Sequence, residues 1–286
     1  MTACILTIAG SDSISGAGLQ IDLKTAAAHG VHACCAVTAV TAQNTTGVSA
    51  IQAVEPDVVR AQVRSVFADV APAAVKVGML GSREVARAVA GELAARPQVP
   101  VVLDPVLAAT AGGALAGAGV LGAIRTELLP RATLVTPNLP EAAALSGVEV
   151  ADEAGMQAAA RALLVMGAGA VLVKGGHGSG EEVADLLLTP QGSWRFTAPR
   201  LPGEYHGTGC SLSAAIACNL ALGAPLPEAV ELAHAYLAET LQAAAAAAPL
   251  GHGSRIFSPL HRLERPYGAG VSGNLCAPVG MVAASP

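Results

Sequence analysis

A cysteine that directly follows a glycine-rich stretch is the residue of this sequence best suited to chemistry. The segment Tyr205–Gly223 reads YHGTGCSLSAAIACNLALG, and its alanine-rich part predicts a helix. The backbone amides of Gly207, Thr208, Gly209 and Cys210 would precede or begin this helix, where unpaired N–H groups and the helix dipole attract an anion. Glycine has no Cβ, so a ligand can approach this backbone closely. The pattern predicts an anion hole.

The thiol of Cys210 is expected to act as a base beside this anion hole. At a helix N-terminus its pKa should be lowered, so that part of it is thiolate near neutral pH. A thiolate would take a proton from an alcohol while the anion hole holds developing phosphoryl charge. A covalent nucleophile is the weaker alternative, because no His–Asn/Asp set indicates acyl transfer. Cys218, further along the same helix, is expected to be buried and inert.

Further candidate residues follow the predicted strands, which cover residues 3–10, 32–40, 73–80, 100–106, 132–138 and 170–176. Polar groups, glycines and a methionine stand near the ends of these strands: Gly10 and then Asp22, Gln43, Met79, Asp104, Asn138 with Glu141, and Lys174. An open parallel sheet binds ligands at the carboxyl ends of its strands. We therefore expect these residues to converge on one rim.

Taken singly, most of these residues also have a purely structural interpretation. Asp22 and Glu141 could be first-turn helix charges, and Asn138 could be an N-cap. Met79 could fill the core, and Lys174 could be an exposed strand end. Their convergence favours a site.

The elements that would position these residues alternate along the chain. Helical patterns cover residues 17–30, 56–70, 82–96, 121–129, 152–168, 208–222 and 227–247, and the strands are continuous apolar runs. This alternation is typical of a doubly wound α/β sheet with parallel strands covered on both faces. Residues 183–201 interrupt this alternation of strands and helices, and their Pro190–Gly192 turn predicts a hairpin at the sheet edge. We expect one domain, 1–264, and a flexible Gly/Pro-rich tail, 265–286.

Composition excludes several classes of protein. The chain has 286 residues and a net charge of −5, so a nucleic-acid partner has no electrostatic support. No apolar run approaches the length of a membrane span, and the N-terminus lacks the basic region of a secretory signal. The six cysteines form no CxxC pair and predict neither a zinc site nor a disulfide framework. A reducing, cytoplasmic location is expected.

Several stretches together resemble the ribokinase-like kinases, and more narrowly the hydroxymethylpyrimidine/phosphomethylpyrimidine kinases of thiamin biosynthesis. They are AGSDSISGAGLQIDLKT, AVTAVTAQNT, VKVGML, DPV, TPNLPEAAALSG, VLVKGGH and HGTGCSLSAAIA, which span roughly residues 3–245 in the order of the family. The chain departs from the family pattern at Ser13–Gly16, Glu204–Tyr205 and Gly251–Phe257. The resemblance implies a three-layer α/β/α fold and an ATP-dependent kinase.

The resemblance also implies roles for individual residues. The Gln43 side chain would bind the aminopyrimidine edge, and Asp22, the Gly10 backbone, Met79 and Val106 would complete the substrate pocket. Cys210 would be the base, and Gly207, Thr208 and Gly209 would form the anion hole with it. Asp104, Asn138 and Glu141 would organise Mg²⁺ and the phosphates of ATP, with Lys174 beside the nucleotide. Mg²⁺ would be held through the phosphates and not by a dedicated protein cage.

Two other functions remain open at this stage. A pyridoxal-type kinase is the first, because pyridoxine also carries a hydroxymethyl group on a six-membered nitrogen ring. Gln43 favours an aminopyrimidine, since an amide offers a paired donor and acceptor. A non-catalytic pyrimidine-binding protein is the second, and the intact Gly207–Cys210 segment and the Asn138/Glu141 pair argue against it. The apolar edge hairpin also suggests a homodimer.

Overall fold

A nine-stranded mixed sheet forms the centre of the described part of the chain, in the order β3-β2-β1-β4-β5-β6-β7-β8-β9. The computed structural model describes residues 3–107, 117, 119–177 and 180–259. The strands are β1 (Cys4–Asp12), β2 (His32–Asn44), β3 (Gly47–Ala53), β4 (Ala74–Val77), β5 (Val101–Leu103), β6 (Leu134–Val135), β7 (Val171–Val173), β8 (Glu182–Thr189) and β9 (Gly192–Pro199). The six from β2 to β7 in the sheet order are parallel, while β3, β8 and β9 pair antiparallel at the two edges.

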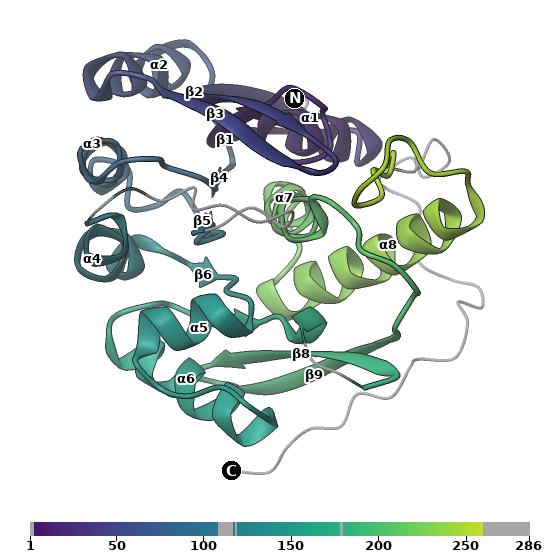
Figure 1. Cartoon of the computed structure of the whole chain (residues 1–286). Helices are drawn as coiled ribbons and strands as arrows, with labels where there is room; N and C mark the ends of the chain where they lie inside the picture. The colour runs from purple at the N-terminus through teal and green to yellow at the C-terminus, as the bar shows by residue number, and fades with distance from the viewer. Residues whose placement is uncertain (1–2, 108–116, 118, 178–179, 260–286) are drawn as a thin grey trace.

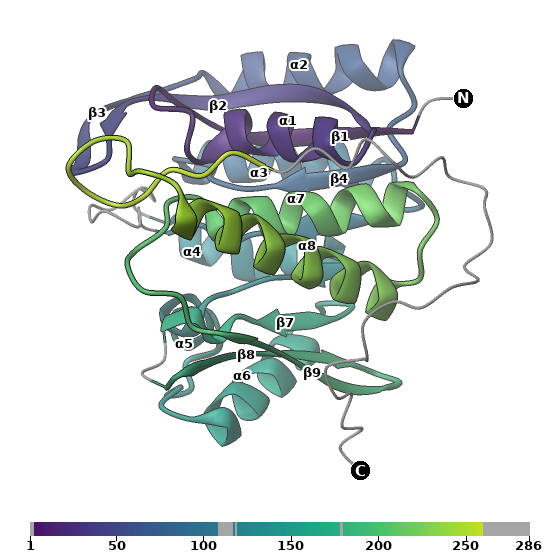
Figure 2. The ribbon, with the colours of Figure 1, turned by 90° about the vertical axis from the view of Figure 1, so that its right-hand side faces the viewer.

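Helices cover both faces of this sheet, as Figures 1 and 2 show. They are α1 (Gly18–Ala28), α2 (Pro56–Asp69), α3 (Arg83–Ala94), α4 (Val120–Ala123), α5 (Leu139–Ser146), α6 (Glu153–Val165), α7 (Thr208–Ala221) and α8 (Leu226–Ala246). After α4 the chain continues through a π-helical turn, Ile124–Leu128, and a 3₁₀ turn, Leu129–Arg131. The predicted three-layer α/β/α fold is confirmed.

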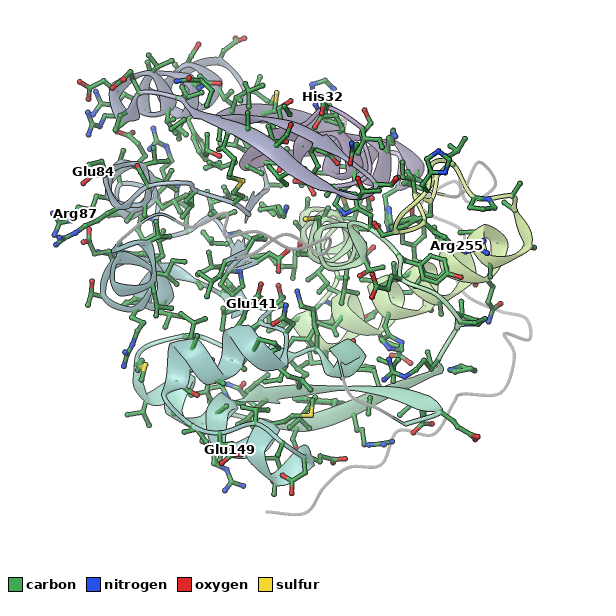
Figure 3. All side chains as sticks on the ribbon, in the orientation of Figure 1. His32, Glu84, Arg87, Glu141, Glu149 and Arg255 are labelled. Atoms are coloured by element: carbon green, nitrogen blue, oxygen red, sulfur yellow. The ribbon has the colours of Figure 1, made fainter. Side chains whose placement is uncertain are left out.

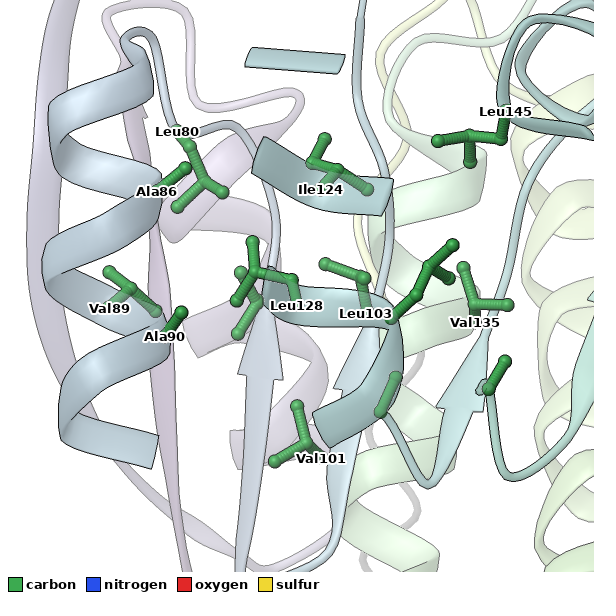
Figure 4. Close-up of a cluster of buried hydrophobic side chains, with 14 of the residues drawn as sticks. Leu80, Ala86, Val89, Ala90, Val101, Leu103, Ile124, Leu128, Val135 and Leu145 are labelled. Carbon is green, nitrogen blue, oxygen red and sulfur yellow. The ribbon is translucent and has the colours of Figure 1, made fainter. Parts of the chain in front are cut away.

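Each face has its own apolar core, because strands of a covered parallel sheet bury side chains on both sides. Helices α2 to α6 pack on one face, in a core that includes Val89 and Leu128 from helical segments and Leu103 and Val135 from strands (Figure 4). Helices α1, α7 and α8 pack on the other face. Cys218 is fully buried in this second core, as expected.

The sequence patterns missed two elements. Strand β3 is almost entirely exposed and carries polar residues, so it lacks the apolar run of the buried strands. Helix α5 is short and has a proline in its first turn, so the helical periodicity of its apolar residues is weak. The edge hairpin β8–β9 is confirmed. The predicted tail, 265–286, lies outside the described residues, and the single domain 1–264 stays a prediction.

The order in which strands are added to the sheet reverses between the parallel neighbours β1 and β4. From β1 the chain steps outward to β2, and from β4 it steps the other way through β5, β6 and β7. This reversal opens a crevice at the carboxyl ends of β1 and β4, which is where open α/β sheets bind ligands.

Candidate active site

A cavity of ≈ 590 Å³ lies at these carboxyl ends. Its wall contains every predicted site residue except Asp22: Gly10, Gln43, Met79, Asp104, Val106, Asn138, Glu141, Lys174, Gly207, Thr208, Gly209 and Cys210. They reach the cavity from strand ends and the loops that follow them and from the first turns of α5 and α7, so the predicted convergence on one rim is confirmed for all but Asp22. Their individual chemical roles stay predictions.

The predicted anion hole coincides with the first turn of α7. Gly207 is the N-cap in a left-handed conformation, with φ 81°, and Ser211 donates the first helical hydrogen bond back to its carbonyl. A Cβ on Gly207 would lie 1.9 Å from the carbonyl oxygen of Gly16, so only glycine lets this turn pack against the β1–α1 loop. Helix α7 has no side-chain cap, which leaves its first amides open to a ligand.

Cys210 stands in this first turn, half-buried and on the cavity wall. The expectation of a lowered thiol pKa is wrong, because burial raises the pKa of Cys210 to about 11. The nearby carboxylates of Asp104 and Asp22 raise the pKa further, whereas Lys76 and a hydrogen bond from the Gly18 amide lower it. Desolvation therefore outweighs the helix terminus at this position.

Lys174 reaches the same helix turn from the end of β7. Its Nζ lies 2.8 Å from Asp104 Oδ1, and this carboxylate also accepts a hydrogen bond from Thr136 at 3.3 Å. Burial alone would raise the pKa of Asp104, but Lys174 and Lys76 outweigh it and hold the pKa below its usual value. A Cβ on Gly209 would lie 2.8 Å from Lys174 Nζ, so the ammonium lies directly against the anion hole.

Asn138 and Glu141 form a capping box at the start of α5. The Asn138 side chain accepts from the Glu141 amide, and Glu141 Oε2 accepts from the Asn138 amide, both at 2.9 Å. The structural interpretation of Asn138 as an N-cap is confirmed, and both residues nevertheless line the cavity. Figure 3 shows Glu141 between α5 and α7 in the middle of the view. Burial raises the pKa of Glu141 to about 7, against the opposing effect of Lys174.

His206 is a further cavity residue, for which the sequence left open a partnership with Cys210 or a local hydrogen bond. It is buried, and its Nε2 lies 2.8 Å from the Gln43 amide nitrogen and 3.1 Å from Asp12 Oδ2. Asp12 in turn accepts hydrogen bonds from the amides of Ile14, Gly16 and Ala17. This network ties Gln43 to the β1–α1 loop and to the residue that precedes Gly207. The signal in the sequence was the position of His206 directly before the glycine segment.

The Gln43 backbone is attached to the same loop. Its amide donates to the Ser13 hydroxyl oxygen at 2.8 Å, and that hydroxyl donates to the Gln43 carbonyl at 2.7 Å. Ser13 therefore contributes to holding Gln43 against the β1–α1 loop.

Asp22 does not line the cavity, and its assignment as a substrate contact is corrected. It is fully buried on α1, where Thr7 donates to Oδ2 and Lys76 Nζ lies 2.8 Å from Oδ2 and 3.0 Å from Oδ1. The helix turns this carboxylate toward the sheet and away from the rim. Lys76, whose side chain is also fully buried, borders the cavity in its place.

Among the described residues, no group of three or more His, Cys, Asp or Glu side chains is arranged to hold a metal ion. None of the described helices has the length and apolar character needed to cross a bilayer. The five cysteines within the described residues are free thiols.

Comparison with known proteins gives a consistent result. The family described as phosphomethylpyrimidine kinase matches residues 12–257. The hydroxymethylpyrimidine/phosphomethylpyrimidine kinase of Rhizobium meliloti is 50% identical over 246 residues, which cover 85% of this chain and 92% of that protein. A crystal structure of the phosphomethylpyrimidine kinase of Clostridium difficile 630 superposes with a TM-score of 0.75 at 36% identity, covering 84% of this chain and 100% of that one.

A related enzyme class shares the fold. The pyridoxal kinase of Staphylococcus aureus, solved with AMP-PCP and pyridoxal, has a TM-score of 0.79 at 30% identity and covers 91% of this chain and 94% of its own. Sequence identity is higher to the pyrimidine kinases. The chain is a kinase and belongs to the phosphomethylpyrimidine kinase family.

Proposed function

We propose that this enzyme transfers the γ-phosphoryl group of ATP to the hydroxymethyl group of 4-amino-5-hydroxymethyl-2-methylpyrimidine. A second transfer then converts the resulting phosphate to a diphosphate. One observation carries the proposal beyond family membership: the thiol of Cys210 and the open amides of the anion hole share one helix turn at the sheet's reversal point. A proton acceptor and a phosphoryl site lie side by side there.

The pyrimidine would lie at the β1–β4 end of the cavity. The Gln43 amide offers a donor and an acceptor to the aminopyrimidine edge, and its link to His206 fixes its direction. The Gly10 backbone and the side chains of Met79 and Val106 supply the wall around the ring. A ring held on these contacts would present its hydroxymethyl group to Cys210.

In the transfer step the Cys210 thiolate accepts the hydroxyl proton as the alcohol oxygen bonds to phosphorus. The bond between the γ-phosphorus and the bridging oxygen breaks, and ADP leaves with that electron pair. In the free enzyme the thiol pKa of about 11 keeps most molecules protonated at neutral pH. The thiol must therefore lose its proton to solvent before it acts as a base.

The phosphates would lie over the amides of Gly207, Thr208 and Gly209, with Lys174 as the adjacent counter-charge. Open amides and carboxylates on one wall also suit a magnesium–nucleotide complex. Asp104, Asn138 and Glu141 would hold Mg²⁺ through its water shell and the phosphates, and the ion would neutralise phosphate charge.

A pyridoxal kinase on the same scaffold is the second candidate, supported by the fold shared with the Staphylococcus aureus enzyme. Purified protein with ATP and Mg²⁺ should turn over the aminopyrimidine alcohol at a higher kcat/KM than pyridoxal. A clear preference for pyridoxal would reverse the assignment. Absence of transfer to either alcohol, in protein that binds the pyrimidine, would favour a non-catalytic binding protein.

We also propose that the chain forms a homodimer in the cytoplasm. The apolar side chain of Ile51 is exposed on the edge strand β3, where a second copy can cover it. The free thiols suit a reducing compartment. Light scattering on the purified protein tests the dimer, and a monomer mass at micromolar concentration would contradict it.

A further inference from the structure

Lys76 is a buried cation that the substrate and phosphate assignments leave without a role. It lies in β4, its side chain has no exposed surface, and it borders the cavity. Among the described residues its ammonium donates only to the two oxygens of Asp22, at 2.8 and 3.0 Å. An apolar residue of similar size would pack at such a strand position without the cost of burying two charges.

Lys76 and Cys210 line the same cavity. Helix α7 packs against β4, and a Cβ on Gly78 would meet Lys76 Nζ at 2.8 Å, at the point where β4 opens into the cavity. Four charged groups from four segments interact electrostatically with the Cys210 thiol: Lys76 of β4, Asp22 of α1, Asp104 after β5 and Lys174 after β7. Of the charged groups, Lys76 acts most strongly on the thiol, and it favours the ionised form.

Asp22 keeps this cation charged. Burial alone would lower the pKa of Lys76, but Asp22, together with Cys210 and Asp104, outweighs burial and raises it. The net effect favours the protonated ammonium of Lys76. The Asp22 carboxylate is in turn fixed by Thr7.

We propose that Lys76 is a positioning residue of the phosphoryl transfer: its ammonium, held by Asp22, stabilises the thiolate of Cys210. The inference rests on the proposed role of Cys210 as the base. The two lysines then have different functions. Lys174 lies beside the phosphates at the first turn of α7, and Lys76 acts on the proton acceptor, Cys210. The buried pair thus contributes to chemistry without touching the substrate.

The ionisation of Cys210 can be measured without substrate. Timed reaction of the full chain with iodoacetamide at pH 8.5, followed by mass spectrometry of the cysteine peptides, gives a rate for each thiol. Only the thiolate reacts, so the Cys210 rate reports its ionised fraction. The exposed Cys35 in the same sample is the internal control.

Four variants give a graded expectation. Lys76→Met should lower the Cys210 rate by about tenfold or more, since a charge at this range shifts a pKa by 1–3. Asp22→Asn/Lys76→Met, which removes the pair and leaves no unpaired charge, should lower it by less. Lys76→Arg should stay near wild type, as should Arg87→Met, which removes an exposed cation on α3 (Figure 3).

A Cys210 rate within twofold of wild type in folded Lys76→Met would overturn the inference. If Lys76→Met does not fold, the double variant decides, and a wild-type Cys210 rate there has the same consequence. The kcat/KM–pH profile gives a second readout. We expect its acidic limb to move to higher pH in Lys76→Met, whereas replacement of a merely structural lysine would leave this limb in place.

Failure of the inference and failure of the proposed function are distinguishable. Near-normal turnover by Cys210→Ala would remove the thiol from the chemistry, whatever the alkylation rates are. Normal alkylation in Lys76→Met, combined with loss of turnover in Cys210→Ala, would leave the base in place and remove only Lys76.

Discussion

Replacing Gly209 by alanine should separate folding stability from catalysis. Gly209 lies within the first turn of α7 at a negative φ, so alanine fits the backbone there. Alanine is favoured over glycine in a helix, so we expect the free energy of unfolding to stay constant or to rise by up to ~1 kcal/mol.

The same methyl group should damage the site. Its carbon would lie 2.8 Å from Lys174 Nζ and 3.8 Å from Asp104 Oδ2. To reach ordinary van der Waals contact the ammonium must move by roughly 0.7 Å, and its flexible side chain allows this at little cost to folding. A displacement near 1 Å within a catalytic array costs up to ~10² in rate, so kcat should fall by about 10- to 100-fold.

Chemical denaturation and steady-state kinetics on one preparation test both parts. Gly91→Ala is the matched control, because Gly91 is an exposed glycine inside α3 and a Cβ there would meet no atom within 4 Å. It should gain similar stability and keep wild-type kcat. A Gly209→Ala enzyme with wild-type kcat and KM for ATP would refute the placement of the phosphates at this turn.

Three further predictions concern single side chains. Cys210→Ala should bind the pyrimidine with unchanged affinity in calorimetry and lose ~10²–10⁴-fold in kcat, and near-normal turnover would show that the thiol is dispensable. Gln43→Leu should weaken pyrimidine binding by roughly 1–3 kcal/mol, because buried polar groups lose their partner. Unchanged affinity would remove Gln43 from the ring site. Glu141 has a folded pKa of about 7, above its ordinary 4.5, so the folded protein holds more protons between these values and its stability should fall as the pH rises through them. Denaturation midpoints of Glu141→Gln should lack this slope, and an identical slope in both proteins would contradict the assignment.

The convergence of the site could be predicted from the sequence because parallel strands end on one edge. Asp104, Asn138 and Lys174 each follow a short apolar run. Such runs are typical of parallel strands that are covered on both faces. The anion hole could be predicted for a local reason, since glycines and a helix start are neighbours in the chain. Strand β3 could not be predicted in this way, because Ser49 and Gln52 interrupt its apolar residues and no continuous apolar run remains.

The direction of the Cys210 pKa could not be predicted from local sequence. It depends on burial and on Asp22, Lys76 and Asp104, which lie more than a hundred residues away along the chain. Asp22 was misplaced for a related reason: its spacing puts it on a helix but does not say which way that helix turns the carboxylate. The lysine in the apolar strand AVKV was the available signal that the carboxylate has a buried partner.

The reversal point of the sheet has a consequence for how the enzyme acquires activity. Its working parts come from residues near both ends of the described chain, so catalytic competence requires contacts of large sequence separation. Such contacts form late and slowly in folding. During refolding from denaturant, recovered kinase activity should therefore lag behind the return of helical circular dichroism, and no isolated half of the chain should show partial turnover.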